Sequence, residues 1–568
     1  MHMIFRYILR HKWVFMLSLM FLALEAFADL LQPAFMAMIV DRGLKEGSVS
    51  GILVYGMKML AIAFCGAICA VMRCIFSSKV SQLVGKEVRK DLYEHVMELS
   101  LEDLDYFDPS QIITMVTSDS TQIQEFVNSL MRMMIKAPIT ASGCLIMIAF
   151  LSPAFIPLLA ILIAAVFFLV YAKVSIGYPK FSLVQTKLEK LNGRARDFLS
   201  SVRVVKAFTG EEKELEGFSA SSDELADANC SALKTIAVFT PLINLAVNLA
   251  IVIALFASRR QDAAQIGVLM AIVNYMTQLL FSLTMLSRAT DHALRAKTSA
   301  DRIARVLGRK PSLENGSMDA SRMESGIEFD NVTFSYSGAS KPSIDSASFS
   351  IRPGEKVGII GQTGSGKSTL ISLIARFYDP DSGTVSIDGT DIRKYSSESL
   401  MRRVAIVSQK AVLFSGTIKD NLAWGNRDAS DEEIRRAAEI AQIRSFIESL
   451  PDGYGTMLGQ GGVNLSGGQK QRMSIARSIL RKPSVLILDD ATSALDASTE
   501  KKVLEGIIEE SKDITLVIVS QRISTVRNME RVIVLDKGRI AAEGRHDELL
   551  DSCDLYNQIY LSQVGGDR

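Results

Sequence analysis

Long apolar runs in the first half of the chain constrain its fold more than any other feature. Each is near the roughly 20 residues that a helix needs to cross a bilayer. Because lipid offers no hydrogen-bond partner to a backbone group, a chain with such runs must cross as α-helices. The first run is far longer than the core of a cleavable signal peptide, so it should remain as a span. The six runs lie at about 13–40, 51–76, 130–151, 154–173, 235–257 and 265–290.

The connections between these spans differ in length and charge. Those at about 77–129 and 174–234 are long and rich in lysine and arginine, which places them in the cytoplasm together with both termini. Few helix breakers interrupt them, so we expect helices that continue well beyond the bilayer and turn near 105–109 and 209–212. The other connections are short, at about 41–50, 152–153 and 258–264.

Charged side chains inside the spans are candidates for a translocation pathway, because a charge in lipid must face a water-filled cavity or a partner helix. Glu25 and Asp29 lie four residues apart on one face of the first span, near its middle, and the cavity is favoured there. Arg132 and Lys136 repeat this spacing near the start of the third span. For that pair we favour a position in the cytosolic extension or side chains that snorkel to the interface.

Composition bounds the function further. The chain has 568 residues and should divide into at least two domains. Its net charge of +1 gives no electrostatic reason to expect a nucleic-acid partner, whereas a mean hydropathy of +0.22 points to membrane. The six cysteines lack metal-ligand spacing, and most lie in apolar stretches, so neither disulfides nor a zinc site is expected.

A phosphate-binding loop stands in the second half of the chain and fits the pattern G-x-x-x-x-G-K-[ST]. Its residues are Gly361, Gln362, Thr363, Gly364, Ser365, Gly366, Lys367, Ser368 and Thr369. Glycines let the backbone curl and aim N–H groups at a polyphosphate, while Lys367 reaches the β and γ oxygens and Ser368 offers a hydroxyl to Mg²⁺. A predicted strand at 357–360 and helix at 370–375 flank the loop, so this site is expected to bind ATP or GTP.

Polar side chains follow two further apolar runs that are suited to central parallel strands. The run at 485–488 ends in Asp489 and Asp490, and the run at 515–519 ends in Ser520 and Gln521. Ligands bind at the carboxyl ends of such strands. Beside the phosphate loop, Asp489 would hold Mg²⁺ and Asp490 would orient or polarise the attacking water.

A second site able to bind phosphate is indicated where a helix at 470–481 follows a short, glycine-rich segment of small residues. Free backbone N–H groups and the positive end of the helix dipole meet there. An ordinary N-cap would explain Ser466 but not both glycines. The segment consists of Leu465, Ser466, Gly467, Gly468 and Gln469.

The chain turns polar from about 309 to 326, where we place a linker. Residues 1–308 would then form the transmembrane domain and 327–568 a nucleotide-binding domain with alternating strands and helices. The expected fold is an α-helical membrane domain with six transmembrane helices followed by an α/β P-loop ATPase domain.

These segments, in this order, resemble the ATP-binding cassette (ABC) transporters, and the six-span half with long cytoplasmic loops resembles their exporter-type half-transporters. The resemblance implies that 361–369 is the Walker A loop, that 465–469 is the signature motif and that Asp489 ends Walker B. It places Gln409 at the Q-loop, as a catalytic and Mg²⁺-contacting residue, and Tyr336 where an aromatic ring stacks on adenine. It further implies that the two cytoplasmic turns are coupling helices and that two nucleotide-binding domains meet head to tail, each Walker A loop facing the other signature.

Several positions depart from the family pattern. Asp490 stands where the family has a catalytic glutamate, and Gln521 stands where it has the switch histidine. Asp490 is one methylene shorter, and Gln521 lacks the basicity of an imidazole. Gln460 replaces the acidic residue usual just before the signature. The arrangement resembles the degenerate-site subunit of heterodimeric bacterial multidrug exporters, and a homodimer that tolerates these residues is the alternative.

The resemblance implies ATP-driven export of hydrophobic or amphipathic small molecules across a bacterial plasma membrane by a multi-pass protein that uses ATP and Mg²⁺. A second half-transporter subunit and membrane lipid are the expected partners. Rival functions are uptake, since some members with this fold move siderophores inward, and an ATP-gated channel or regulatory membrane subunit.

Overall fold

The computed structural model describes residues 1–46, 49–258, 266–320, 325–510 and 513–564. The chain divides into two compact units. The first comprises Met1–Met97 and Pro109–Gly308, and the second comprises Glu98–Asp108 with the residues from Arg309 onward. The expected domain boundary at 308 would leave residues 98–108 in the membrane domain, whereas in the structure this segment packs with the second unit.

The first unit is helical, and within the described residues six helical stretches are long and apolar enough to cross a membrane. This confirms the six-span membrane domain. The short connections expected at 41–50 and 258–264 include residues that lie outside the described ranges. The helices are α1 (His2–Arg10), α2 (Lys12–Glu46), α3 (Val49–Glu98), α5 (Pro109–Thr114), η1 (Met115–Asp119), α6 (Ser120–Ser129), η2 (Leu130–Met134), α7 (Lys136–Leu151), η3 (Pro153–Phe155), α8 (Ile156–Ala207), α9 (Glu211–Ala237), α10 (Phe239–Ser258) and α11 (Ile266–Leu307).

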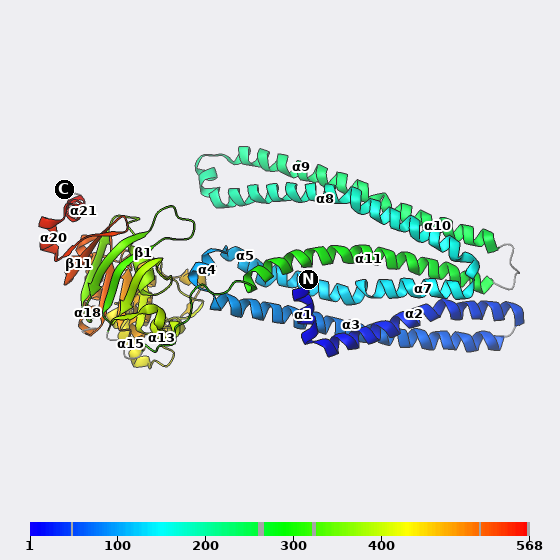
Figure 1. Ribbon diagram of the computed structural model, residues 1–568, viewed down its shortest axis with the longest axis horizontal. Coiled ribbons are helices and arrows are strands. Elements are labelled where there is room, and N and C mark those ends of the chain that lie inside the picture. The colour runs from blue at the N-terminus through cyan, green and yellow to red at the C-terminus, as the bar shows by residue number, and fades with distance from the viewer. Residues whose placement is uncertain (47–48, 259–265, 321–324, 511–512, 565–568) are drawn as a thin grey trace. The chain divides into compact units, whose positions relative to one another are not determined.

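The long connections are helical extensions, as expected. With 52 residues at about 1.5 Å each, α8 is far longer than the roughly 30 Å thickness of a bilayer core. It ends at Ala207, and α9 begins at Glu211, so the expected turn near 209–212 is confirmed. Figure 1 shows α8 and α9 running side by side as a hairpin. Phe208, at the tip of this hairpin, is 82% exposed.

A buried ion cluster joins three spans of the membrane unit. Glu25 in α2 is buried and pairs with Arg73 in α3 and with Lys136 in α7, whose Nζ lies 2.5 Å from Glu25 Oε1. Lys136 also lies 3.1 Å from Asp29 Oδ2. Glu25 therefore does not face the cavity that was favoured for it, whereas the location of Lys136 in a cytosolic extension or at the interface stays a prediction. The other option, a charge that faces partner helices, is the one found, because the opposite charges replace the water that lipid excludes.

The second unit contains a mostly parallel six-stranded sheet in the order β12-β11-β3-β10-β9-β6 and an antiparallel sheet in the order β2-β1-β4-β5. β7 and β8 form a small separate ribbon. Figure 1 shows helices around these sheets, including α13, α15 and α18. The strands are β1 (Ile327–Phe334), β2 (Ile344–Ile351), β3 (Lys356–Gly361), β4 (Ser382–Ile387), β5 (Thr390–Asp391), β6 (Val404–Val407), β7 (Gly416–Thr417), β8 (Met457–Leu458), β9 (Val485–Asp489), β10 (Thr515–Val519), β11 (Arg531–Asp536) and β12 (Arg539–Gly544).

Helices accompany these strands in an α/β alternation, which confirms the expected ATPase fold class. They are α4 (Leu101–Asp105), α12 (Lys367–Ile374), η5 (Ile392–Lys394), α13 (Ser397–Arg403), α14 (Ile418–Ala423), α15 (Asp431–Ile440), α16 (Arg444–Ser449), η6 (Gly453–Gly455), η7 (Gln460–Gly462), α17 (Gly467–Leu480), α18 (Ala497–Glu510), α19 (Ile523–Val526), α20 (His546–Ser552) and α21 (Asp554–Val564).

The central strands are apolar on both faces because each face covers a separate core. In β9, Leu486 and Leu488 belong to one buried cluster, and Val485 and Ile487 belong to another. Successive strand residues point to opposite faces, so a continuous apolar run is what a doubly covered parallel strand requires. The predicted strands at 357–360, 485–488 and 515–519 correspond to β3, β9 and β10.

Removing Glu25 should destabilise the membrane unit, because the buried Arg73 would lose its carboxylate and Lys136 would keep only its pair with Asp29. Breaking a buried pair costs about 3 kcal/mol or more. We expect Glu25→Ala to lower the free energy of unfolding in detergent by about 3 kcal/mol or more, which is measured as a lower unfolding midpoint. The control is Glu94→Ala, which removes an exposed pair with Lys90 and should change stability by less than about 1 kcal/mol. Equal midpoints for the two variants would show that the cluster does not hold the spans together.

Candidate functional site

The phosphate loop connects β3 to α12 and requires glycine at defined places. Gly364 and Gly366 have φ values of 80° and 102°, in the left-handed region that side chains disfavour. A Cβ on Gly366 would also lie 2.5 Å from the carbonyl oxygen of Ser343, and one on Gly361 would lie 2.2 Å from that of Leu535. Larger residues would therefore push the loop away from the neighbouring strands.

Lys367 begins α12, and its ammonium group turns back toward the loop. Nζ donates to the carbonyl oxygens of Gly361 at 2.8 Å and Gln362 at 2.7 Å. Burial lowers the pKa of Lys367, while Asp489 and Asp490 act in the opposite direction. The loop thus holds a positive charge bonded to neutral carbonyls, at the N-terminus of a helix, where anions bind favourably.

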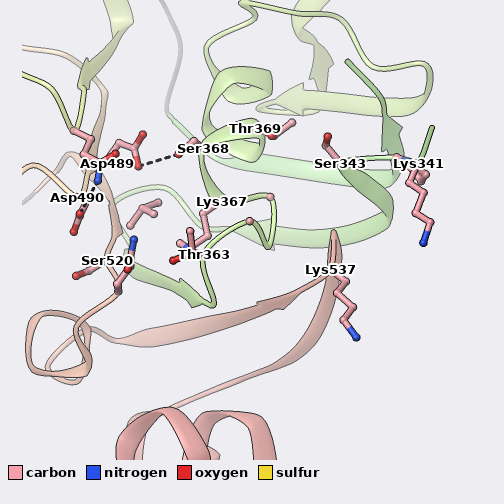
Figure 2. A pocket seen from close by; sticks show the side chains of 16 residues that line it. Lys341, Ser343, Thr363, Lys367, Ser368, Thr369, Asp489, Asp490, Ser520 and Lys537 are labelled. Atoms are coloured by element: carbon pink, nitrogen blue, oxygen red, sulfur yellow. Dashed lines mark hydrogen bonds between the residues drawn. The ribbon is translucent and has the colours of Figure 1, made fainter. Parts of the chain in front are cut away.

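The two predicted carboxylates lie at the same edge of the sheet. Ser368 Oγ lies 3.4 Å from Asp489 Oδ1, and Gln409 Nε2 donates to Asp490 Oδ2 at 3.1 Å. Figure 2 shows Asp489 beside Ser368 and Asp490 next to it. Burial raises the pKa of both carboxyl groups, because removal from water disfavours the charged form. A cation bound between Ser368 and Asp489 would offset that cost.

A cavity of about 600 Å³ brings these groups together, a size usual for small-molecule sites. Gln521, at the end of β10, lines it together with Gln409 and both aspartates, as the resemblance implied. Sequence reasoning missed Lys341 and Ser343, which lie just before β2, and Lys537, which lies in the turn between β11 and β12; they carry no local signal, and Figure 2 shows them across the cavity from the aspartates. The lining is Lys341, Pro342, Ser343, Thr363, Gly364, Gly366, Lys367, Ser368, Thr369, Gln409, Asp489, Asp490, Val519, Ser520, Gln521 and Lys537.

A metal at this site would be held with the help of its ligand. The described residues contain no group of three or more His, Cys, Asp or Glu side chains that could hold a metal ion alone. Mg²⁺ takes oxygen ligands and keeps several waters, so it is usually bound by one or two carboxylates together with substrate phosphates. Ser368, Asp489 and Gln409 fit that role as a partial oxygen set beside the phosphate loop.

Tyr336 lies beside the cavity rather than in its lining. Its hydroxyl donates to Thr369 Oγ1 at 3.3 Å, and its ring meets the edges of Phe334 and Tyr378. This packing holds the ring next to Thr369, the last residue of the phosphate loop.

The second segment expected to bind phosphate, 465–469, is the capped N-terminus of α17 in the structure. Ser466 Oγ accepts from Gln469 N at 3.3 Å, and Ser466 N donates to Gln469 Oε1 at 2.8 Å. Gly468 is needed because a Cβ there would lie 2.9 Å from the carbonyl oxygen of Ala494. None of 465–469 lines the cavity described above. The ordinary N-cap interpretation thus explains Ser466 and packing explains Gly468, while Gly467 has open room beside Ala494.

The short helix α4 packs within the second unit, next to the rings of Tyr336 and Tyr378, a contact that sequence reasoning did not find. Tyr378 Oη donates to Asp105 Oδ2 at 2.6 Å, and Arg309 Nε donates to Asp103 Oδ1 at 2.7 Å. Although burial acts against it, hydrogen bonds from Ser100, Ser312 and Arg309 lower the pKa of Asp103 to about 2. Because Tyr378 also packs against Tyr336, with ring centroids 5.4 Å apart, α4 is linked to the ring beside the phosphate loop.

Comparison with known proteins places this geometry in a family. Residues 15–283 match the model of the ABC transporter transmembrane region, and residues 344–493 match that of the ABC transporter. An uncharacterised ABC transporter ATP-binding protein of Bacillus subtilis, YfiB, is 35% identical over 97% of this chain and 96% of that protein. An ATP-dependent lipid A-core flippase of Idiomarina loihiensis is 31% identical over 99% of this chain and 97% of that protein.

A solved structure supports the same assignment. A bacterial Atm1-family ABC exporter with ATP bound superposes with a TM-score of 0.82 at 26% identity, covering 97% of this chain and 98% of that one. With six membrane-spanning stretches, a phosphate loop beside two strand-end aspartates and relatives matched along nearly their whole length, the chain belongs to the ABC transporters and is a transport ATPase of the exporter type.

Proposed function

We propose that this chain is one half of a heterodimeric ABC exporter that moves hydrophobic or amphipathic molecules and that its own ATP site hydrolyses slowly. The observation that carries the proposal is the pair Asp490 and Gln521 in the lining of one cavity. The family pattern has glutamate and histidine there. Both replacements keep hydrogen-bonding groups, so the site retains ATP, but neither supplies the reach or basicity that prompt hydrolysis uses.

The chain's own residues hold the nucleotide in this proposal. Lys367 and the loop amides bind the phosphates, Tyr336 stacks on the base, and Ser368, Asp489 and Gln409 hold Mg²⁺. When bound, Mg²⁺ neutralises charge on the transferred phosphoryl group. Gln409 donates to Asp490 and fixes where its shorter carboxylate points. A misplacement of roughly 1 Å costs on the order of a hundredfold in rate, so one missing methylene is enough to slow turnover.

A partner subunit is supported by surfaces that this chain does not use by itself. The signature residues 466–469 lie outside the cavity, as expected if they complete the ATP site of another subunit. The tip of the α8–α9 hairpin exposes the large apolar side chain of Phe208 in a cytoplasmic turn. In the head-to-tail arrangement implied by the family, this turn docks on a nucleotide-binding domain and is covered there.

The proposed substrate class follows from the membrane unit and from its relatives. In the described part of the spans, Glu25, Asp29, Arg73 and Lys136 pair with one another rather than offering one sign of charge to a cavity. An apolar or amphipathic substrate suits such a pathway, and lipid A-core flippases are among the relatives.

We place the protein in a bacterial plasma membrane with both termini and the ATPase unit in the cytoplasm. Substrate accumulation driven by ATP in inverted vesicles would support export, whereas extrusion from them would support uptake.

ATP turnover by the purified chain is the first prediction. In lipid nanodiscs, the chain alone should hydrolyse ATP about a hundredfold more slowly than the double variant Asp490→Glu/Gln521→His, because the longer carboxylate and the imidazole restore the family's reacting groups. Both proteins should bind ATP with similar affinity. Brisk turnover by the unaltered chain would remove the reason for a partner while leaving the ATPase assignment intact.

Loss of a single hydroxyl should separate ATP turnover from transport. Tyr378→Phe keeps the aromatic packing against Tyr336 but removes the hydrogen bond to Asp105 on α4. In the Asp490→Glu/Gln521→His background, where turnover is fast enough to follow, we expect unchanged ATP affinity and a stimulation of ATPase by transported compounds that is reduced about 2- to 10-fold, the range of one net hydrogen bond. Tyr395→Phe is the matched control, since its hydroxyl bonds the carbonyl of Ile387 within the same unit. Equal stimulation in both variants would contradict a coupling role for the α4 contact.

A further inference from the structure

The C-terminal helix α21 holds the loop that carries Gln521. The side-chain amide of Gln563 makes two hydrogen bonds to that loop: Nε2 donates to the carbonyl oxygen of Gln521 at 2.7 Å, and Oε1 accepts from the backbone N–H of Ile523 at 2.9 Å. One planar amide therefore satisfies a backbone acceptor and a backbone donor two residues apart. Glutamine suits this place because it has both groups.

Helix α21 is itself anchored in the core, so Gln563 is not on a free tail. Tyr556 is fully buried, and its hydroxyl lies 2.7 Å from Nδ1 of His546. Ile559 and Tyr560 pack against the same hydrophobic core. Positions 556, 559, 560 and 563 have the spacing of one helix face, so the packing of the first three residues directs Gln563 toward the loop.

The other side of the loop is held by residues that follow Walker B. Arg522 Nη2 donates to the carbonyl oxygen of Ser493 at 3.0 Å. The buried carboxylate of Glu500 accepts from Thr525 Oγ1 at 2.8 Å and from Thr492 Oγ1 at 2.7 Å. The loop that carries Gln521 is thus held on one side by residues that follow Asp490 and on the other side by Gln563 of α21.

We propose that Gln563 is a positioning residue that fixes the Gln521 loop and thereby gives this pocket its preference for ATP over ADP. Gln521 lines the cavity, and its side-chain amide can donate to a terminal phosphate oxygen. Only ATP presents the γ-phosphate that such a contact needs. The inference rests on the proposed nucleotide site, but it does not depend on whether the second subunit is a copy of this chain or another protein.

The test compares the affinities of two nucleotides for the full-length chain in nanodiscs with Mg²⁺ present. AMP-PNP stands in for ATP because it is not hydrolysed, and both it and ADP are measured by displacement of a fluorescent nucleotide. Gln563→Ala should weaken AMP-PNP binding by about 2- to 10-fold, the range of the one net hydrogen bond from Gln521 to the γ-phosphate, and leave ADP binding unchanged. Gln563→Glu should weaken AMP-PNP at least as much, because a carboxylate oxygen would face the carbonyl of Gln521.

Two controls make the outcome decisive. Ser562→Ala, on the neighbouring residue, loses only a bond to the carbonyl of Ile559 within the same helix and should keep the wild-type ratio. Hydrogen exchange of the peptide containing Ile523 should become faster in Gln563→Ala, since the N–H loses its acceptor. An unchanged AMP-PNP to ADP ratio in both Gln563 variants, or an equal loss for both nucleotides, would overturn the proposal. Brisk ATPase in the unaltered chain would refute the heterodimer without affecting this ratio.

Discussion

The neighbouring placement of β3, β10 and β9 in one parallel sheet is the constraint on which the rest of the ATPase unit depends. β10 pairs with β3 on one side and with β9 on the other, both in parallel. Their carboxyl ends therefore meet at one edge and deliver the phosphate loop, Gln521 and the two aspartates from segments up to 160 residues apart. Had any of these strands run antiparallel, its polar end would lie at the opposite edge, and no cavity would hold all three.

Charges are treated in opposite ways in the two units. In the membrane unit Glu25 is buried and paired with two cations, which leaves little charge for a ligand. In the ATPase site Lys367 donates to two backbone carbonyls, and Asp489 and Asp490 accept from Ser368 and Gln409, so these partly or fully buried charges have neutral partners. In the membrane unit, opposite charges of the protein thus offset the cost of burying a charge, whereas in the nucleotide site a bound nucleotide and metal would offset it.

What the sequence could predict followed from local pattern. The phosphate loop, the strand-end aspartates and the long apolar helices each carry their signal within about 30 residues, and the structure has them where they were expected. The contacts that were missed join distant segments: Lys136 is 111 residues from Glu25, and Tyr378 is 273 residues from Asp105. Gln563 carries no motif at all, because its role depends on how the face of α21 packs. Single side chains that meet only through the fold leave no periodic trace in the chain.

The grouping of residues 98–108 with the ATPase unit alters how the two halves of the molecule are attached. The chain passes between the units at three places, after Met97, after Asp108 and after Gly308, instead of at one. With a single covalent connection, a conformational change would pass between the units mainly through non-covalent surface contacts. Three covalent crossings join the units here, and two of them bound an eleven-residue segment that Arg309 and Tyr378 hold within the second unit. A conformational change in the second unit can therefore act on α3 and α5 through the backbone itself.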